Sequence, residues 1–187
     1  MPRKPNGAES VRDLIADTAA KLFVLHGVHS VSLHDIATDA HLSKGTLYYH
    51  YPTKEALILE IARRNVAAIT DAMFLWVDTL VRGTVAREAF DILLDILLRD
   101  KPLLILHMVL CTEAALGEPA LKDMLNACYK EWSIMLEVGS LKIQSRRSAS
   151  ARINAKHFFM LFSGYLAHSS GGILDVDKND FLDFILM

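Results

Sequence analysis

The sequence lacks the features of a secreted or membrane protein. Its two cysteines, Cys111 and Cys128, form neither a metal-binding spacing nor a disulfide framework, which favours a reducing compartment. No uninterrupted apolar stretch approaches the roughly 20 residues that a membrane-spanning helix needs. The first ten residues also lack the apolar core of a signal peptide. We therefore expect a cytoplasmic protein with no membrane contact.

An excess of charge of one sign is also missing. The 187-residue chain has a formal net charge of −2, and within its first sixty residues six Lys and Arg face seven Asp and Glu. Bulk charge therefore gives no argument for binding nucleic acid. Any such binding must depend on how particular side chains are arranged, not on a basic surface.

Motifs of catalysis and metal binding are equally scarce. The chain has no Gly-rich phosphate loop, no nucleophile elbow and no Glu-x-x-His pair of a di-metal helical bundle. The pair His34-Asp35 could belong to a metal phosphohydrolase, but a convincing set of further ligands is missing. His107 and Cys111 lie one helical turn apart, yet two ligands do not make a metal site. We predict no catalytic residue, no metal and no cofactor.

Helical periodicity, by contrast, runs through most of the chain. Apolar residues recur at helical spacing, and the breaks fall at glycines, prolines and one polar run. The pattern predicts an all-α fold of about nine helices behind a flexible arm at residues 1–8. The expected helices span residues 9–26, 33–40, 44–51, 54–81, 85–99, 102–117, 118–145, 151–170 and 178–187.

Two short helices near the N-terminus have clear start and stop signals. Ser32 and Asp35 have the spacing of a capping box, and Ser43 is placed to cap the next helix. Between them, His41 stands where a left-handed backbone conformation would be useful. Pro52 then ends the second helix, because the residue before a proline is pushed out of the helical region. Two short helices joined by a three-residue turn predict a helix-turn-helix.

The second short helix carries the sequence KGTLYYHY, with an unusual density of polar aromatic residues. If Leu47 is its inward anchor, the remaining side chains are donor-rich, stackable and largely exposed, as a helix in a DNA major groove requires. Lys54 in the first turn of the following helix is unfavourable for the helix dipole. A DNA phosphate between Lys54 and the exposed N–H groups would explain it.

The stretch LFVLHGVHSVSLHDIATDAHLSKGTLYYHYPTKEAL resembles the DNA-binding domain of transcriptional regulators of the TetR family (TetR/AcrR-like), over about residues 10–58. The resemblance implies that Tyr48 and Lys54 contact phosphate. This chain departs from the family pattern at His41, where the family has a turn glycine, and at Tyr51, usually phenylalanine. The expected DNA-binding residues are Ser32, His34, Lys44, Gly45, Thr46, Tyr48, Tyr49, His50 and Lys54.

The rest of the chain is apolar enough to require both a core and a partner. The segment INAKHFFMLFSGYLAH is apolar nearly all round, so it must be buried on several faces. In the family, the last two helices pair with their copies to form a dimer. A single-chain core helix is the alternative interpretation. The expected dimer interface comprises Phe158, Phe162, Gly164, Tyr165, Phe181 and Phe184.

Large or half-polar residues in the same region suggest a cavity for a small inducer, as the family resemblance implies. Little charge is present there, so we expect a neutral or largely apolar ligand. The expected ligand-binding residues are Met73, Trp76, Met108, Cys111, Tyr129, Trp132 and Phe158.

Together these features predict a homodimeric transcriptional regulator, more a repressor than an activator, released from a palindromic double-stranded operator by a small-molecule inducer. An arm and helix-turn-helix domain would span residues 1–52, and a ligand-binding and dimerisation domain residues 53–187. A helical small-molecule-binding or scaffold dimer without DNA binding is the alternative, and an enzyme is third.

Overall fold

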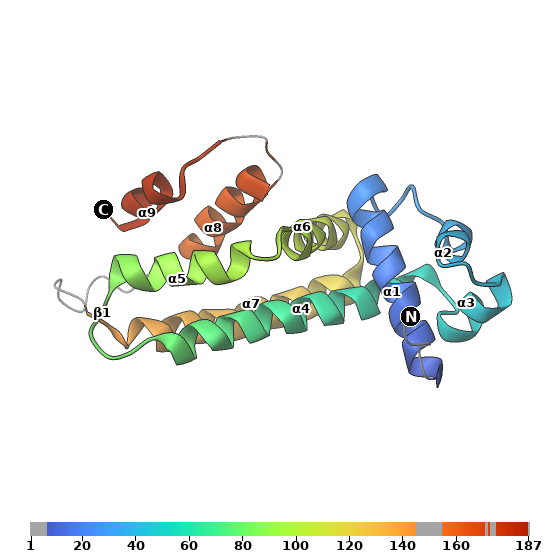
Figure 1. The fold of residues 1–187 in the computed structure, drawn as a ribbon, viewed down its shortest axis with the longest axis horizontal. Helices are drawn as coiled ribbons and strands as arrows, with labels where there is room; N and C mark the ends of the chain where they lie inside the picture. The colour runs from blue at the N-terminus through green and yellow to red at the C-terminus, as the bar shows by residue number, and fades with distance from the viewer. Residues whose placement is uncertain (1–6, 145–154, 171, 173–174, 187) are drawn as a thin grey trace, which may run out of the picture.

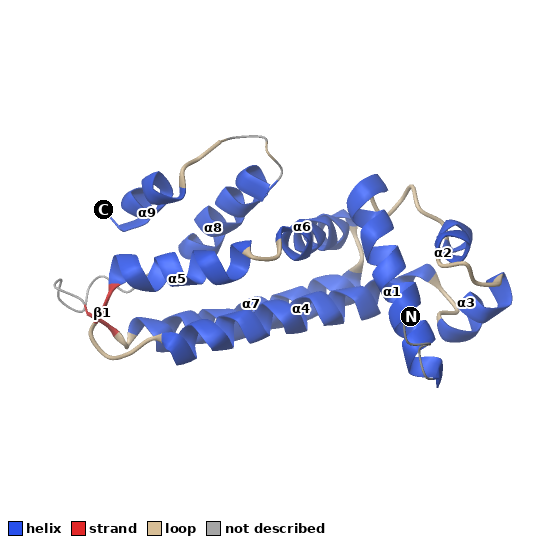
Figure 2. Ribbon diagram, in the orientation of Figure 1, coloured by secondary structure: helices blue, strands red, loops and turns tan. Residues whose placement is uncertain are grey.

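The computed structural model describes residues 7–144, 155–170, 172 and 175–186, and this part of the chain is predominantly helical (Figures 1 and 2). The all-α prediction is confirmed, and most helix ends fall within a few residues of the expected positions. Residues 1–6 of the arm expected at 1–8, and the helical start over 151–154, lie outside the described residues, whereas Gly7 and Ala8 belong to the first helix and not to an arm. The described helices are α1 (Gly7–His26), α2 (Leu33–Asp39), α3 (Lys44–His50), α4 (Lys54–Thr79), α5 (Ala86–Leu98), α6 (Lys101–Leu116), α7 (Pro119–Ser140), α8 (Ala155–Ser170) and α9 (Lys178–Leu186).

The helices are arranged around the long pair α4 and α7, which run side by side in the same direction (Figure 1). Helices α1, α2 and α3 gather at one end, where α1 packs against both α4 and α6. Helices α5 and α6 cover one side of the long pair, while α8 and α9 lie beyond them near the other end. Helix α4 therefore reaches from the three-helix unit into the second half of the molecule.

A two-residue parallel pairing, which the helical pattern did not predict, joins β1 (Thr84–Val85) to β2 (Ile143–Gln144). It forms where the loop after α4 meets the end of α7. Beside it, Lys142 Nζ donates to the carbonyl oxygens of Val77 and Leu80 at 2.7 and 3.0 Å. The lysine satisfies carbonyl groups that the end of a helix leaves without partners. The far end of α4 is thus fastened to α7.

Local signals in the helix-turn-helix act as the sequence predicts. Ser32 and Asp35 form a complete capping box at α2, and Ser43 accepts a hydrogen bond from the Thr46 N–H at the start of α3. His41 has a φ of +54°, the left-handed conformation expected for the turn. Leu47 is fully buried and anchors α3 to the unit. The turn is therefore built without the glycine that the family resemblance would supply.

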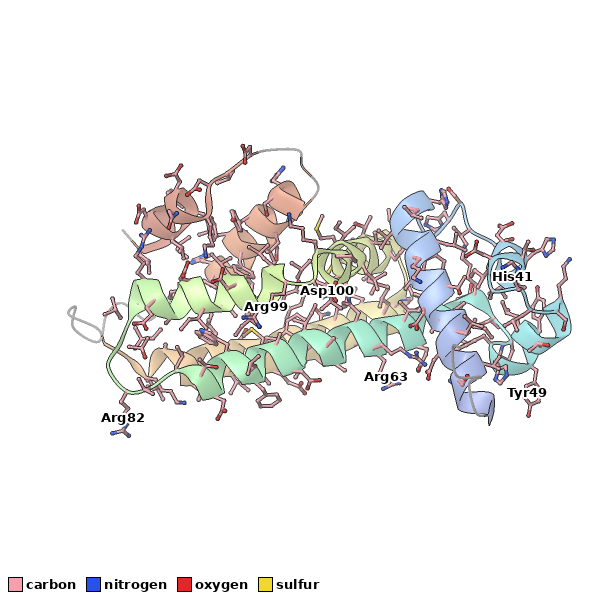
Figure 3. The ribbon with its side chains drawn as sticks, viewed as in Figure 1. His41, Tyr49, Arg63, Arg82, Arg99 and Asp100 are labelled. Carbon is pink, nitrogen blue, oxygen red and sulfur yellow. The ribbon has the colours of Figure 1, made fainter. Side chains whose placement is uncertain are left out.

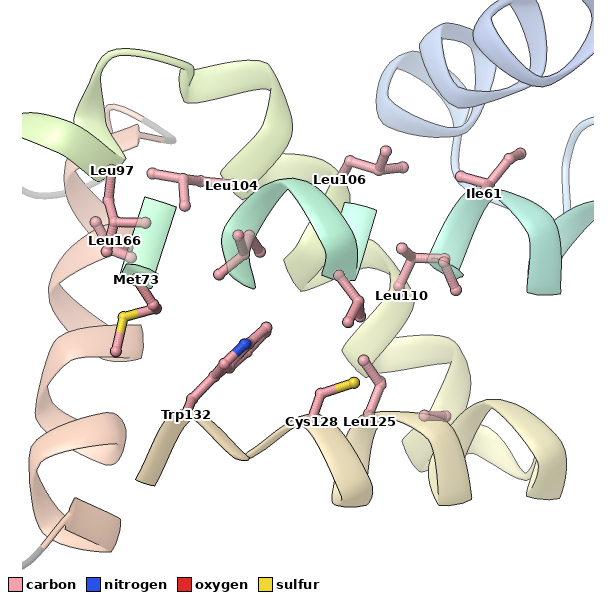
Figure 4. Close-up of a cluster of buried hydrophobic side chains, with 14 of the residues drawn as sticks. Ile61, Met73, Leu97, Leu104, Leu106, Leu110, Leu125, Cys128, Trp132 and Leu166 are labelled. Atoms are coloured by element: carbon pink, nitrogen blue, oxygen red, sulfur yellow. The ribbon is translucent and has the colours of Figure 1, made fainter. Parts of the chain in front are cut away.

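The core of the second half packs between α4, α5, α6, α7 and α8, and Figure 4 shows part of it, with Met73, Trp132 and Leu166 drawn among the surrounding leucines. Trp76 of α4 is fully buried farther along the same core. Its indole N–H donates to the Ala89 carbonyl oxygen at 2.7 Å, and its ring lies against Gly139 of α7. The close packing of α4 and α7 depends on the missing side chain at Gly139.

Replacement of Gly139 should therefore destabilise the protein. A Cβ atom at this position would overlap the Trp76 ring, which is held by its hydrogen bond to Ala89. For Gly139→Ala we expect a loss of about 1–3 kcal/mol in the free energy of unfolding, measured by urea denaturation. The matched control is Gly45→Ala, because a Cβ there meets only Ser43 Oγ at 3.7 Å. Equal stability of the two variants would contradict the packing described here.

Candidate functional site

Helix α3 presents most of its side chains to the surface. Tyr48 is 50% exposed and Tyr49 is 81% exposed, whereas Leu47 is fully buried. Lys44 is also exposed, while Thr46 and His50 are partly buried. Figure 3 shows Tyr49 and His41 projecting from the end of the molecule that carries α2 and α3. The predicted DNA-contact residues of α3 thus share one accessible end of the protein, with tyrosine hydroxyls, a threonine and a lysine available to phosphates and base edges.

The hydroxyl groups near the start of α3 and α2 are partly occupied by capping. Thr46 Oγ1 lies 2.8 Å from Ser43 Oγ, and Ser32 donates from both its N–H and its Oγ to Asp35 at 2.8 and 2.6 Å. The hydrogen bonds from Ser32 lower the pKa of Asp35. Asp35 therefore has a structural partner, which explains the His34-Asp35 pair as part of a helix start.

Lys54 has a second role that the sequence did not indicate. Its ammonium donates to the Val28 carbonyl oxygen at 2.6 Å and lies 6.0 Å from the centre of the Phe23 ring. The hydrogen bond joins the start of α4 to the loop between α1 and α2. An intramolecular reason for a lysine at the start of α4 therefore exists beside the phosphate contact predicted for it, and two further N–H donors of the ammonium remain to be used.

Several acids of the N-terminal region are engaged by two arginines of α4. Arg64 contacts Asp13 of α1 at 2.7 Å, and both Arg63 and Arg64 hold Glu60. The hydrogen bond from Arg63, reinforced by Arg64, lowers the pKa of Glu60 to about 2. These acids lie at the junction of α1 and α4, away from the exposed side of α3. A near-neutral domain can therefore still offer DNA a surface that is not strongly acidic.

An open groove of about 550 Å³ lies between α7 and α8. Of the seven residues predicted to bind ligand, Tyr129 lines it. The sequence analysis missed the other lining residues, although Phe159 and Ser163 stand one helical turn apart on α8 and could have been recognised as one face. The lining residues are Asn126, Tyr129, Lys130, Ser133, Phe159, Met160 and Ser163.

Aromatic and polar side chains lie behind the groove. The Tyr129 ring centre is 5.1 Å from that of Trp132 and 5.6 Å from that of Phe159. The Tyr129 hydroxyl is 3.1 Å from His107 Nε2 and 3.9 Å from Cys111 Sγ. Cys111 and Trp132, both predicted to bind ligand, thus contact the groove residue Tyr129, although neither of them lines the groove. His107, considered earlier only as half of a metal pair, belongs to the same cluster.

Three other predicted ligand residues belong to the core. Trp76, Met73 and Phe158 are 0, 2 and 5% exposed, and none of them lines the groove. Met108 is partly buried on α6 and also does not line it. Large apolar side chains have the same helical spacing whether they fill a core or surround a cavity, so the pattern could not separate the two.

The prediction for the dimer interface needs a similar correction. Phe158, Phe162, Tyr165 and Phe181 are 5–8% exposed within one chain, so they are not available on its surface. The Tyr165 and Phe181 rings stack at 4.2 Å and hold α9 against α8. Phe184 is 62% exposed, as predicted, and a Cβ at Gly164 would meet open space.

The exposed apolar side of α8 instead carries Met160, which also stands at the edge of the groove, and Leu161; they are 72 and 44% exposed. With Gly164 they have helical spacing along one side, and we call these three residues with Phe184 the outward face of α8 and α9. The helix is buried on one side and apolar on another, as expected. Of the predicted interface residues, Gly164 and Phe184 lie on the outward face, whereas the other four are buried within the protomer.

Two kinds of site are missing from the described part of the chain. No helix there is both long and apolar enough to cross a membrane. Within the same residues, no group of three or more His, Cys, Asp or Glu side chains could hold a metal ion.

Comparison with known proteins identifies the N-terminal unit. The family model described as bacterial regulatory proteins, tetR family, matches residues 15–61, which run from α1 through the helix-turn-helix into α4. The transcriptional repressor KstR2 of Mycolicibacterium smegmatis is 34% identical over 62 residues, covering 33% of this chain and 30% of that protein. The chain spans less than a third of the length of the curated relatives that it matches. The curated relatives are transcriptional regulators, not enzymes.

Solved structures extend the similarity to the whole fold. A protein from Saccharomonospora viridis, described as a transcriptional regulator in complex with choline, has a TM-score of 0.76 and 25% identity, covering 95% of this chain and 94% of that one. A protein from Mesorhizobium loti, described as a TetR-family transcriptional regulator, has a TM-score of 0.74 and 20% identity, covering 97% and 94%.

Proposed function

Because residues 15–61 match the tetR family model and the fold resembles that of solved transcriptional regulators, we propose that this chain is a TetR-family protein, a homodimeric transcriptional repressor released from a palindromic operator by a small ligand. The single observation that carries the DNA-binding part is α3: one buried anchor, Leu47, and exposed polar aromatic residues on the remaining sides. A repressor is favoured over an activator because KstR2 is a repressor by name.

The proposed dimer follows from the size of the recognition helix. A helix of seven residues reads only a few base pairs, whereas two copies about 34 Å apart read two half-sites of a palindrome. We assign the outward face of α8 and α9 to the contact between copies. The arm and helix-turn-helix domain would span residues 1–52 and the second domain 53–187, with α4 joining them. Its place in the cytoplasm follows from the need to share a compartment with the operator.

The groove between α7 and α8 is the proposed ligand site. Its volume of about 550 Å³ suits a small organic molecule, and its aromatic walls suit a largely apolar one. The protein from Saccharomonospora viridis, which shares the fold, was solved with choline, a molecule of that size class. The ligand of this chain would therefore bind against α7, which packs on α4 and α6, the two helices that contact α1 of the DNA-binding unit.

Helix α4 is the proposed connection between the two sites. With 26 residues it is about 39 Å long. Its first turn lies beside α3, and its middle contacts His107 of α6 through Asn65 at 2.9 Å. A second connection runs along α6, where Glu113 lies 3.2 Å from His29 of the loop before α2. A ligand that shifts α6 and α7 would tilt α3 and disturb the spacing of the two recognition helices.

A gel-shift assay with the DNA flanking the gene for this protein tests the proposed function. We expect the full chain to form a retarded complex at low salt. Unlabelled operator should compete for the protein more strongly than unrelated DNA does. If the protein binds none of these DNA fragments but is dimeric, the alternative function is supported: a helical small-molecule-binding or scaffold protein without DNA binding.

Tyr48→Phe and Lys54→Ala should weaken binding to all DNA sequences by about 3- to 10-fold each, because the lost hydrogen bonds go to phosphate and not to bases. Lys54→Ala should also reduce the slope of log affinity against log salt by about one. Substitutions of Lys44 or Thr46 should instead change which operator is preferred.

Arg82→Ala is the matched control for the lost charge, because Arg82 lies at the opposite end of the molecule from Tyr49 (Figure 3). It should leave both the affinity and the salt slope unchanged. Fluorescence anisotropy over a salt series measures both quantities. The proposed docking of α3 fails if the Tyr48 and Lys54 variants bind as the wild type does.

A further inference from the structure

Three polar side chains form a continuous chain of hydrogen bonds from α4 through α6 to α7. Asn65 of α4 is 2% exposed, and its Nδ2 donates to the Leu103 carbonyl oxygen at 2.8 Å. Its Oδ1 lies 2.9 Å from His107 Nδ1, and His107 Nε2 lies 3.1 Å from the Tyr129 hydroxyl. The chain ends at Tyr129, which lines the groove between α7 and α8.

The donor and acceptor of each hydrogen bond in this series follow from the orientation of the Asn65 amide. A carbonyl oxygen only accepts, so the Leu103 contact must be made by the amide nitrogen of Asn65, and the amide oxygen faces His107. His107 Nδ1 must then carry a proton and donate it. Burial lowers the pKa of His107 to about 4, so the ring is neutral near pH 7 and its Nε2 can only accept. The Tyr129 hydroxyl therefore donates to His107.

Tyr129 consequently offers the groove an acceptor and not a donor. Its one hydroxyl proton is committed to His107, and lone pairs remain on the oxygen. Burial raises the pKa of Tyr129, and the Ser163 hydroxyl, which also lines the groove, partly opposes that shift.

We propose that the groove selects small organic molecules that present a hydrogen-bond donor to the oxygen of Tyr129, with an apolar or cationic body against the aromatic rings of Tyr129 and Phe159. The inference rests on the proposed function only for the role of the groove as a ligand site. The lining residues include the ammonium group of Lys130 and no carboxylate, which favours an apolar body over a cationic one. The hydrogen-bond chain fixes the polarity at Tyr129 from inside the protein.

A ligand that can only accept hydrogen bonds is rejected for a specific reason. To bind Tyr129, such a ligand would have to accept the hydrogen bond that the hydroxyl now donates to His107. His107 Nε2 would then have only the thiol of Cys111, at 3.6 Å, as a donor. A buried acceptor without a good partner costs free energy, so Tyr129 discriminates against such a ligand.

The test compares two matched pairs of probes on the full chain by calorimetry. Choline and its O-methyl ether differ in one hydroxyl donor, as do benzyl alcohol and benzyl methyl ether. In at least one pair, the alcohol should bind about 3- to 10-fold more tightly than the ether. The choline pair reports a cationic body and the benzyl pair a neutral one. Equal or tighter binding of the ether in both pairs, or no binding of any probe, overturns the proposal.

Tyr129→Phe keeps the ring and removes the acceptor, so the preference for the alcohol should fall to about one. A preference that persists in this variant places the donor contact elsewhere and overturns the assignment. Thermal unfolding and the gel-shift on flanking DNA check that the variant is folded and still binds DNA, because Tyr129 belongs to α7, outside the three-helix unit that contains α3. Failure of the wild type to bind DNA would refute the proposed function, while the alcohol preference would remain a separate result.

Nitrogen-15 NMR of the histidine rings tests the proton direction itself. The His107 signals, assigned by their loss in His107→Gln, should show the tautomer with the proton on Nδ1. They should remain neutral well below the pH at which exposed histidines titrate. The tautomer with the proton on Nε2 would reverse the hydrogen-bond chain, and Tyr129 would then donate to the groove. That result would overturn the proposal even if the protein is stable.

Discussion

Leu161→Glu is expected to convert the protein into a folded monomer that binds its operator about 100-fold or more weakly. Leu161 is 44% exposed on the outward face of α8 and α9, so a charge there should not disturb the protomer. Against a second copy the same carboxylate would be buried without a partner, which costs several kcal/mol. Loss of the dimer separates the two recognition helices and removes the gain from simultaneous binding of two half-sites.

Two further variants make the result specific. Leu116→Glu places the same charge on a leucine that is 68% exposed at the end of α6, and it should remain dimeric. Phe162→Glu stands next to Leu161 in sequence but is 5% exposed, so it should unfold the protomer. Light scattering at micromolar concentration and circular dichroism distinguish these outcomes. If Leu161→Glu stays dimeric, the contact between copies lies on another face.

A ligand bound in the groove is expected to weaken operator binding by about 5- to 150-fold, the usual range of coupling between two sites. The physical reason is that α4 is held at three places. Lys142 fastens its far end, Asn65 joins its middle to α6, and Lys54 ties its first turn to the loop at Val28. Movement of α6 should therefore reach the start of α4 and the adjoining α3.

Thermodynamic linkage gives this prediction a strict form. Saturating operator must lower the ligand affinity by the same factor by which saturating ligand lowers the operator affinity. Calorimetry of the tightest-binding probe, with and without operator DNA, measures the first factor, and anisotropy with and without probe measures the second. Equal probe affinity in both titrations would exclude the coupling. Asn65→Leu, which removes the link to His107, should reduce both factors together.

Much of the fold could be predicted from the sequence because its signals are local. Ser32, Ser43 and Thr53 each accept a hydrogen bond from the helix that they precede, and this geometry needs nothing beyond the nearest few residues. The left-handed backbone at His41 could be inferred for the same reason. The pairing of β1 with β2 depends instead on two distant segments, and a pattern of two residues gives no signal.

The parts of the site that sequence reasoning missed depend on which side of a helix meets which neighbour. Phe162 and Leu161 are adjacent and equally apolar, yet one is buried in the protomer and the other is exposed. Trp76 was expected in the cavity, but Gly139 on another helix makes room for its ring in the core. The contact between Asn65 and His107 gave no signal, because a hydrogen bond between two helices leaves no spacing in the sequence.

The construction of α3 also bears on how such proteins diversify. Within its seven residues, Leu47 is the one fully buried side chain, and the cap comes from Ser43 outside the helix. Stability and recognition therefore draw on separate residues. Substitutions at Lys44, Tyr48 or Tyr49 can accumulate with little effect on folding, so gene duplicates could acquire new operators by a few single changes. For the same reason, a combinatorial library at these positions is a practical route to reprogramming a genetic circuit.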